Sequence, residues 1–240
     1  MKNIQLILFT AIITGILISC NRDEPTIQTS LTVRVIDEIG DPVTDAGVEL
    51  YSNFDDWINE SSPVYEAVIT DLEGKASFTN IDSGSYFINA YKGHANNWEE
   101  QVLKPVIDGF ENTTNVTVTE NGSGNLASAP GKKWIMTSFL TNGGDYYPFL
   151  ENCVKDDTLI FFKGPHFGAH ITSRGSLKCS SNQEDNIMGF WTLLDNNSIL
   201  QLQIGNNILN WNIDTLKVEK LSVTYVESGN IQKVDYIPIE

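Results

Sequence analysis

The chain has 240 residues, enough for one large or two small domains. It carries 15 basic and 31 acidic residues, and its net charge of −16 argues against nucleic acid as a partner because such a surface repels phosphate backbones. A hydrophobic fraction of 41% with 10% aromatic residues argues against an intrinsically disordered chain.

The first residues have the layout of an export signal. Lys2 supplies a positive charge, and a mainly apolar stretch runs from Ile4 to Ile18. A membrane-spanning helix needs roughly 20 apolar residues, and this stretch is shorter. We therefore expect residues 1–19 to be a cleaved signal peptide, with a retained transmembrane anchor as the weaker alternative.

The signal ends on Leu17-Ile18-Ser19-Cys20. These residues resemble the lipobox of bacterial lipoproteins, in which the cysteine becomes the lipidated first residue of the mature chain. The resemblance implies acyl chains such as palmitate on Cys20, and two or more chains hold a protein firmly to a bilayer. The alternative is an ordinary signal peptide with an incidental cysteine.

Residues 20–30 are polar and lack periodicity, which indicates a tether that follows the anchor. Within it, Asn21-Arg22-Asp23-Glu24 resembles the surface-export signal of Bacteroidetes lipoproteins. The resemblance implies an outer-membrane lipoprotein exposed on the cell surface. A merely solvated tether on a lipoprotein that faces the periplasm is the alternative.

Alternation of apolar and polar residues begins at Leu31, with Leu31, Val33 and Val35 on one face. Further short strands, separated by turns rich in glycine, proline and polar residues, are expected at 46–51, 64–70, 76–79, 86–91 and 116–119. Short strands at this spacing predict an all-β fold, with a β-sandwich over residues 31–120.

Two motifs in this stretch resemble the carboxypeptidase regulatory-like, transthyretin-related β-sandwich family. One is Gly-x-Pro-Val-x-x-Ala-x-Val, and the other is Thr-Asp-x-x-Gly-x-x-x-Phe followed by Gly-x-Tyr. The matching positions are Gly40, Pro42, Val43, Ala46, Val48, Thr70, Asp71, Gly74, Phe78, Gly84 and Tyr86. The resemblance implies a non-catalytic accessory or adhesive module, and therefore no enzyme.

Two insertions depart from that family's pattern, at 54–66 and 94–109, and they carry Trp57 and Trp98. Aromatic side chains on loops above a rigid sandwich stack on sugars or anchor protein partners. We therefore name Trp57 and Trp98 as candidate recognition residues, with packing against the sandwich as the alternative.

Small, flexible residues at 121–131 indicate a linker. Strand-like segments then recur at 132–139, 158–162, 189–194, 199–204, 208–213, 216–226 and 234–237. The series predicts an antiparallel meander, and closure into a β-barrel would remove its exposed edges.

The second half, residues 132–240, resembles the lipocalin-like domains of Bacteroidetes lipoproteins. The residues that match in order are Trp134, Cys153, Asp156, Asp157, Phe161, Cys179, Gly189 and Trp191. The resemblance implies an antiparallel β-barrel, which either holds a small apolar ligand or is packed solid. The segment 163–168 departs from the pattern, and we expect a local difference in a loop there.

Two cysteines, Cys153 and Cys179, remain once Cys20 is assigned to the lipid. An even pair in an exported protein predicts a disulfide. The loop that it would close contributes roughly 3 kcal/mol in the chain-entropy estimate.

Motifs for metal binding and catalysis are weak. His166 and His170 are four residues apart, which suits a metal on a helix, but Gly164, Pro165 and Gly168 make a helix improbable, and we expect no metal site. Adjacent carboxylates at 55–56, 99–100 and 156–157 lack the spacing of a calcium loop, and we interpret them as solvated turns.

The sequence contains no G-x-S-x-G, H-E-x-x-H or phosphate-binding loop, so we expect neither catalytic residues nor a cofactor. Together these patterns predict a lipid-anchored cell-envelope protein that acts as a non-catalytic binding or accessory module. Its partner would be a small apolar ligand, a glycan or an envelope protein. The alternative is a structural subunit of an outer-membrane nutrient-uptake or adhesion assembly.

Overall fold

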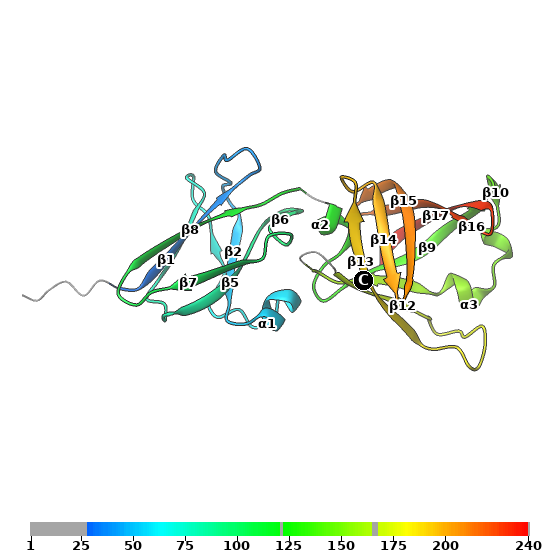
Figure 1. Ribbon diagram of the computed structural model, residues 1–240, viewed down its shortest axis with the longest axis horizontal. Helices are drawn as coiled ribbons and strands as arrows, with labels where there is room; N and C mark the ends of the chain where they lie inside the picture. The colour runs from blue at the N-terminus through cyan, green and yellow to red at the C-terminus, as the bar shows by residue number, and fades with distance from the viewer. Residues whose placement is uncertain (1–27, 121, 165–167, 240) are drawn as a thin grey trace, which may run out of the picture.

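The computed structural model describes residues 28–120, 122–164 and 168–239. Cys20 and its flanking signals lie outside the described residues, and so does His166. The described chain forms two β-rich bodies that lie end to end along the longest axis (Figure 1). The all-β fold class predicted from the sequence is confirmed. Within the described ranges, no helix is long and apolar enough to cross a membrane.

The first body, called the sandwich below, contains two small sheets. The first sheet has the order β4-β1-β8, formed by Lys75–Thr79, Ser30–Ile36 and Glu111–Thr117. The second has the order β3-β2-β5-β6, with β7 also paired to β5; these strands are Val68–Ile69, Gly47–Tyr51, Gly84–Lys92, Ala95–Asn96 and Val102–Val106. Alternate residues of both sheets meet in one core, which includes Leu31, Val33, Val35, Val48, Leu50 and Ile88. The alternation that begins at Leu31 is therefore confirmed as a strand with one buried face.

Turn chemistry explains part of the Thr-Asp-x-x-Gly motif at residues 70–74. The Asp71 carboxylate accepts hydrogen bonds from the backbone N–H groups of Glu73 and Lys75 at 2.8 and 2.9 Å. Gly74 completes this turn with φ +73°, and a Cβ there would lie 2.6 Å from the Val35 carbonyl oxygen. Only glycine therefore fits where this turn meets β1.

The insertion at 54–66 contains α1 (Phe54–Asn59), a helix that the sequence patterns did not predict. Asn53 caps its first turn, because the Asn53 side chain accepts a hydrogen bond from the Asp56 N–H. Trp57 is the buried residue of this helix, and its indole N–H donates to the Ile88 carbonyl at 3.1 Å. The helix is thus fixed to β5 through Trp57.

The second body is a closed antiparallel barrel of eight strands, called the barrel below. Its strands are β9 (Lys132–Thr141), β11 (Thr158–Phe161), β12 (Gly168–Ser173), β13 (Asn186–Leu194), β14 (Ile199–Ile204), β15 (Asn207–Lys217), β16 (Lys220–Glu227) and β17 (Asn230–Ile239). Pairing of β17 with β9 closes the barrel, and β10 (Gly144–Asp145) extends β9 as a short hairpin. Closure leaves the barrel without a free edge, as the sequence patterns predicted.

Aromatic side chains contribute much of the barrel core. Phe161 and Trp191 meet edge to face with ring centroids 6.1 Å apart. Further around the barrel, Trp211 stacks on Tyr225 at 5.3 Å and lies 6.5 Å from Tyr236. Trp134 and Trp191 are buried in this core.

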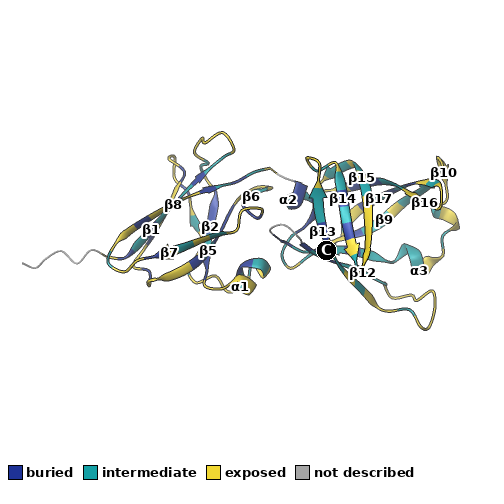
Figure 2. Ribbon diagram, viewed as in Figure 1, coloured by how far each residue is buried: buried dark blue, intermediate teal, exposed yellow. Residues whose placement is uncertain are grey.

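The segment 121–131, which has the composition of a linker, contains α2 (Gly122–Leu126). This helix is drawn as buried in Figure 2, and Leu126 belongs to the barrel core. The Trp134 indole N–H donates to the Leu126 carbonyl at 2.8 Å, and the Lys132 ammonium donates to the carbonyls of Asn125 and Val218 at 2.6 and 2.7 Å. The described part of the connection, residues 122–131, is therefore held against the barrel by these contacts.

The predicted disulfide between Cys153 and Cys179 is confirmed. It ties α3 (Asn152–Lys155) to the loop between β12 and β13. Asp156 and Asp157 hold the same loop, because the Asp156 carboxylate accepts from the N–H groups of Ser176 and Leu177, and Asp157 pairs with Arg174 at 2.5 Å. These two carboxylates are thus anchors of a loop, which corrects their interpretation as solvated turns.

Candidate ligand site between the sandwich and the barrel

A lysine from the barrel is buried in the sandwich. Lys163 follows β11 in the segment 163–168, where the sequence indicated only a local difference in a loop. Its side chain has no solvent exposure. A charged side chain is buried to this extent only when it finds partners.

The Lys163 ammonium has three hydrogen-bond acceptors, all in the sandwich. It donates to the Trp57 carbonyl at 3.0 Å, to the Glu60 carboxylate at 2.9 Å and to the Asn89 side-chain carbonyl at 3.1 Å. An ammonium carries three N–H donors, so every one of them is satisfied.

Two aromatic rings complete this environment. The ammonium lies 4.5 Å from the centroid of the Trp57 ring and 5.3 Å from that of the Trp98 ring. Both distances fall within the range of cation–π attraction, which is stronger in sites that exclude water. We call Trp57, Glu60, Asn89, Trp98 and Lys163 the lysine site.

Two electrostatic effects act on the pKa of Lys163 in opposite directions. Burial lowers the pKa of Lys163, and the negative charge of Glu60 acts in the opposite direction. The Glu60 side chain remains 29% exposed, so this ion pair is buried on the lysine side and reaches solvent on the carboxylate side.

Asn89 connects the lysine site to a second carboxylate. Its amide N–H groups donate to Glu49 and to Glu60, both at 3.2 Å. Its carbonyl accepts from Lys163 and also from the Trp98 indole N–H at 3.3 Å. The amide is 1% exposed and has a partner on each side.

Two segments of the sandwich, residues 54–66 and 94–109, contribute most of this site. Trp57 and Glu60 come from α1 and its C-terminal cap, where Glu60 adopts a left-handed backbone with φ 49°. Trp98 comes from the second insertion, and its backbone N–H donates to the Asn96 side chain. The structure thus brings Trp57 and Trp98 together, but it buries them at 0% and 8% exposure and directs them at Lys163 of the same chain.

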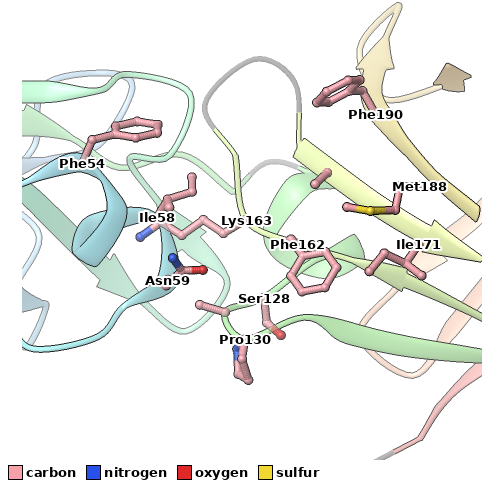
Figure 3. A pocket seen from close by; sticks show the side chains of 12 residues that line it. Phe54, Ile58, Asn59, Ser128, Pro130, Phe162, Lys163, Ile171, Met188 and Phe190 are labelled. Carbon is pink, nitrogen blue, oxygen red and sulfur yellow. The ribbon is translucent and has the colours of Figure 1, made fainter. Parts of the chain in front are cut away.

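An apolar cavity of about 550 Å³ lies beside the lysine site, between the sandwich and the barrel. Figure 3 shows Phe54 and Ile58 on the α1 side, and Phe162, Ile171, Met188 and Phe190 on the outer face of the barrel. Lys163 extends between the two sides, and Asn59 and Ser128 add polar groups. We call this space the interface cavity.

The barrel wall of the interface cavity follows from strand register. Ile171 lies opposite Met188, and Ala169 lies opposite Phe190, so four side chains of β12 and β13 share the outer face. Met188 and Phe190 are 69% and 53% exposed, which is unusual for large apolar side chains next to each other.

His170 lies inside the barrel, on the face of β12 opposite to Ala169 and Ile171. It is fully buried beside Phe161, and burial lowers its pKa. His166, the other histidine of the pair considered for a metal site, lies outside the described residues.

Sequence patterns did not single out Glu60, Asn89 or Lys163. Glu60 and Asn89 lie 103 and 74 residues from Lys163 in the chain, and no local pattern links positions so far apart. The one available signal was that the segment 163–168 departs from the lipocalin-like pattern that the second half of the sequence resembles.

These observations define a two-body β protein, in which a sandwich and a closed barrel are joined through a buried lysine. No family model matches the sequence, and no curated protein matches it either. Among solved structures, a streptococcal ancillary pilin is 11% identical with a TM-score of 0.35, and the match covers 90% of this chain. The chain spans 60% of the length of that pilin.

Two further structures are similar at the same distant level. A DUF3823 family protein from Bacteroides ovatus is 11% identical with a TM-score of 0.29, and the match covers 88% of this chain and 97% of that one. The major pilin subunit of Bacillus cereus is 9% identical with a TM-score of 0.29, and 89% and 95% of the two chains are covered.

Proposed function

We propose that this protein is a lipid-anchored, non-catalytic binding module of the cell envelope that takes a small apolar molecule into the interface cavity. The observation that carries the proposal is the cavity itself, which is apolar and has walls from both the sandwich and the barrel. The anchor is the acylated Cys20 that the lipobox resemblance implies, and the Cys153–Cys179 disulfide suits an exported protein.

The size and chemistry of the interface cavity support a small apolar ligand. Ligand sites commonly occupy about 300–1,000 Å³ at the junction of two folded units, with mainly apolar walls and a few polar groups. Here the polar groups are Asn59 and Ser128, because the Lys163 ammonium has no solvent exposure and already has its three acceptors. The ligand would therefore be a mainly hydrocarbon molecule with one uncharged polar end, directed at Asn59 and Ser128.

The lysine site supports binding by fixing the two walls of the cavity. Lys163 belongs to the barrel, and its acceptors Trp57, Glu60 and Asn89 belong to the sandwich. A site whose walls are held in place before the ligand arrives loses less conformational entropy on binding.

Titration with N-phenyl-1-naphthylamine, an uncharged apolar dye, tests this function. We expect saturable binding with increased fluorescence, and displacement of the dye by 1-decanol, a hydrocarbon with one uncharged polar end. Ala169→Trp places an indole among the cavity walls and should weaken dye binding at least about tenfold, or by about 1.4 kcal/mol. Asn210→Trp, which adds an exposed indole on β15 away from the cavity, is the matched control. Non-saturable binding, or equal binding by both variants, would contradict the proposal.

A further inference from the structure

The Asn89 carboxamide lies between one amine and two carboxylates in a site that excludes most water. The amine of Lys163 contacts its oxygen, and the carboxylates of Glu49 and Glu60 contact its nitrogen. We propose that Lys163 and Asn89 form an intramolecular isopeptide bond, with release of ammonia, and that Glu60 transfers the protons. The product would join the sandwich to the barrel covalently.

The nucleophile is positioned beside the group that it would attack. The Lys163 Nζ atom lies 3.1 Å from Asn89 Oδ1, and contacts with the Trp57 carbonyl and the two indole rings hold it there. Held in this way, an amine and a carboxamide react as an effectively unimolecular pair, which removes most of the entropic part of the barrier.

The protonation state of the amine also favours the reaction. An amine attacks a carbonyl carbon only in its neutral form, and desolvation is one way in which proteins activate lysine nucleophiles. Burial lowers the pKa of Lys163, and this raises the fraction of neutral amine.

Glu60 contacts both nitrogens whose protons must move. A single oxygen of Glu60, Oε1, accepts from Lys163 Nζ at 2.9 Å and from Asn89 Nδ2 at 3.2 Å. A general acid–base must lie within hydrogen-bond reach of the proton donor and the proton acceptor, and Glu60 satisfies both conditions through this one atom.

The charges that develop on the Asn89 oxygen and nitrogen during the attack are stabilised by neighbouring side chains. The Trp98 indole N–H donates to Asn89 Oδ1 at 3.3 Å, so it faces the oxygen that becomes negative in the tetrahedral intermediate. Glu49 accepts from Asn89 Nδ2 at 3.2 Å and would stabilise that nitrogen as it is protonated. A cleft of about 350 Å³, lined by Glu49, Glu60 and Trp98 among others, offers ammonia an exit.

The step is balanced without an oxidant, a cofactor or a second substrate. Glu60 takes one proton from the Lys163 ammonium, and the freed electron pair on Nζ forms a bond to Asn89 Cγ while the carbonyl π electrons move to Oδ1. Glu60 then delivers its proton to Nδ2 and takes a second proton from Nζ. The carbonyl re-forms, the Cγ–Nδ2 bond breaks with its electron pair on nitrogen, and ammonia leaves with the proton that Glu60 holds, as ammonium.

Peptide mapping of the purified, reduced full chain after trypsin digestion tests the proposal. We expect peptide 156–174, uncleaved after Lys163, joined to peptide 76–92, with a mass equal to their sum minus one ammonia. Fragmentation should place the junction at Lys163 and Asn89. Recovery of unmodified peptides 76–92, 156–163 and 164–174 from the folded protein would overturn the proposal.

Variants distinguish the proposed bond from other reactions that release ammonia. Asn121 and Asn142 each precede glycine, where cyclisation to a succinimide also releases ammonia. The joined peptide should persist in an Asn121→Asp, Asn142→Asp double variant and should be absent from Lys163→Arg and from Glu60→Gln. A joined peptide in Lys163→Arg would overturn the assignment of the nucleophile, and one at full yield in Glu60→Gln would overturn the role of Glu60.

Discussion

Trp57 holds the Lys163 ammonium in two ways, because its backbone carbonyl accepts a hydrogen bond at 3.0 Å and its indole ring lies 4.5 Å away. The indole is itself fixed by its N–H bond to Ile88 of β5. One helix residue of the sandwich therefore sets where the first residues after β11 of the barrel can lie.

Loss of the Lys163 side chain should destabilise the protein. Lys163→Met keeps most of the apolar stem but leaves Glu60 and Asn89 without a partner at the junction. Breaking a buried ion pair costs about 3–5 kcal/mol. For protein in which the proposed isopeptide bond has not formed, the partial exposure of Glu60 reduces the expected loss in free energy of unfolding to about 2–3 kcal/mol. Urea denaturation measures this loss. Lys178→Met, which removes an exposed pair with Asp185, should change stability little, and equal losses in the two variants would contradict the assigned role.

Stability should rise with pH above about 8 because of Lys132. Burial lowers the pKa of Lys132 from 10.5 to about 8, so between these values the folded state has released a proton that the unfolded state still binds. Stability increases with pH wherever the unfolded state binds more protons. The increase should run from pH 8 to about 9.5, before tyrosines begin to ionise in the unfolded chain.

Lys132→Met provides the matched comparison for this pH dependence. Without a titrating group at position 132, the rise in the free energy of unfolding between pH 8 and about 9.5 should largely disappear. An unchanged slope in urea denaturation over this interval would show that other groups cause it.

Removal of the disulfide should lower stability by about 3 kcal/mol, since the bond closes a long loop in the unfolded chain. Cys153→Ala with Cys179→Ala tests this, and thermal unfolding of the wild type with and without a reductant measures the same bond independently. Cys20→Ala should leave the unfolding transition unchanged. A double variant as stable as the wild type would mean that Asp156 and Arg174 hold the loop without the disulfide.

Membrane attachment should depend on Cys20. We expect the wild type to fractionate with membranes and to carry acyl chains at its N-terminus by mass spectrometry. Cys20→Ala should lose both properties, because the side chain that would be acylated is gone. Membrane association that survives in Cys20→Ala would contradict a lipid anchor at this residue.

Most strands of both bodies were predictable from local pattern. The alternation from Leu31 and the segments at 199–204 and 208–213 correspond to β1, β14 and part of β15, since each is a short period-2 repeat. β12 was not predicted, because its start lies beside glycine and proline residues typical of loops. α1 was missed because six residues show too little periodicity to indicate a helix.

Alternation along the chain was enough to predict the all-β class, and the lipocalin-like resemblance of the second half implied the barrel. The pairing of Cys153 with Cys179 followed from assigning Cys20 to a lipid, which leaves two cysteines. The directions of Trp57 and Trp98, in contrast, depend on the tertiary structure. Their rings enclose Lys163, more than 60 residues further along the chain, and Asn89 and Glu60 complete the same site. A buried ammonium needs its acceptors from every direction at once, and the sheets that supply them meet only after the sandwich and the barrel have folded.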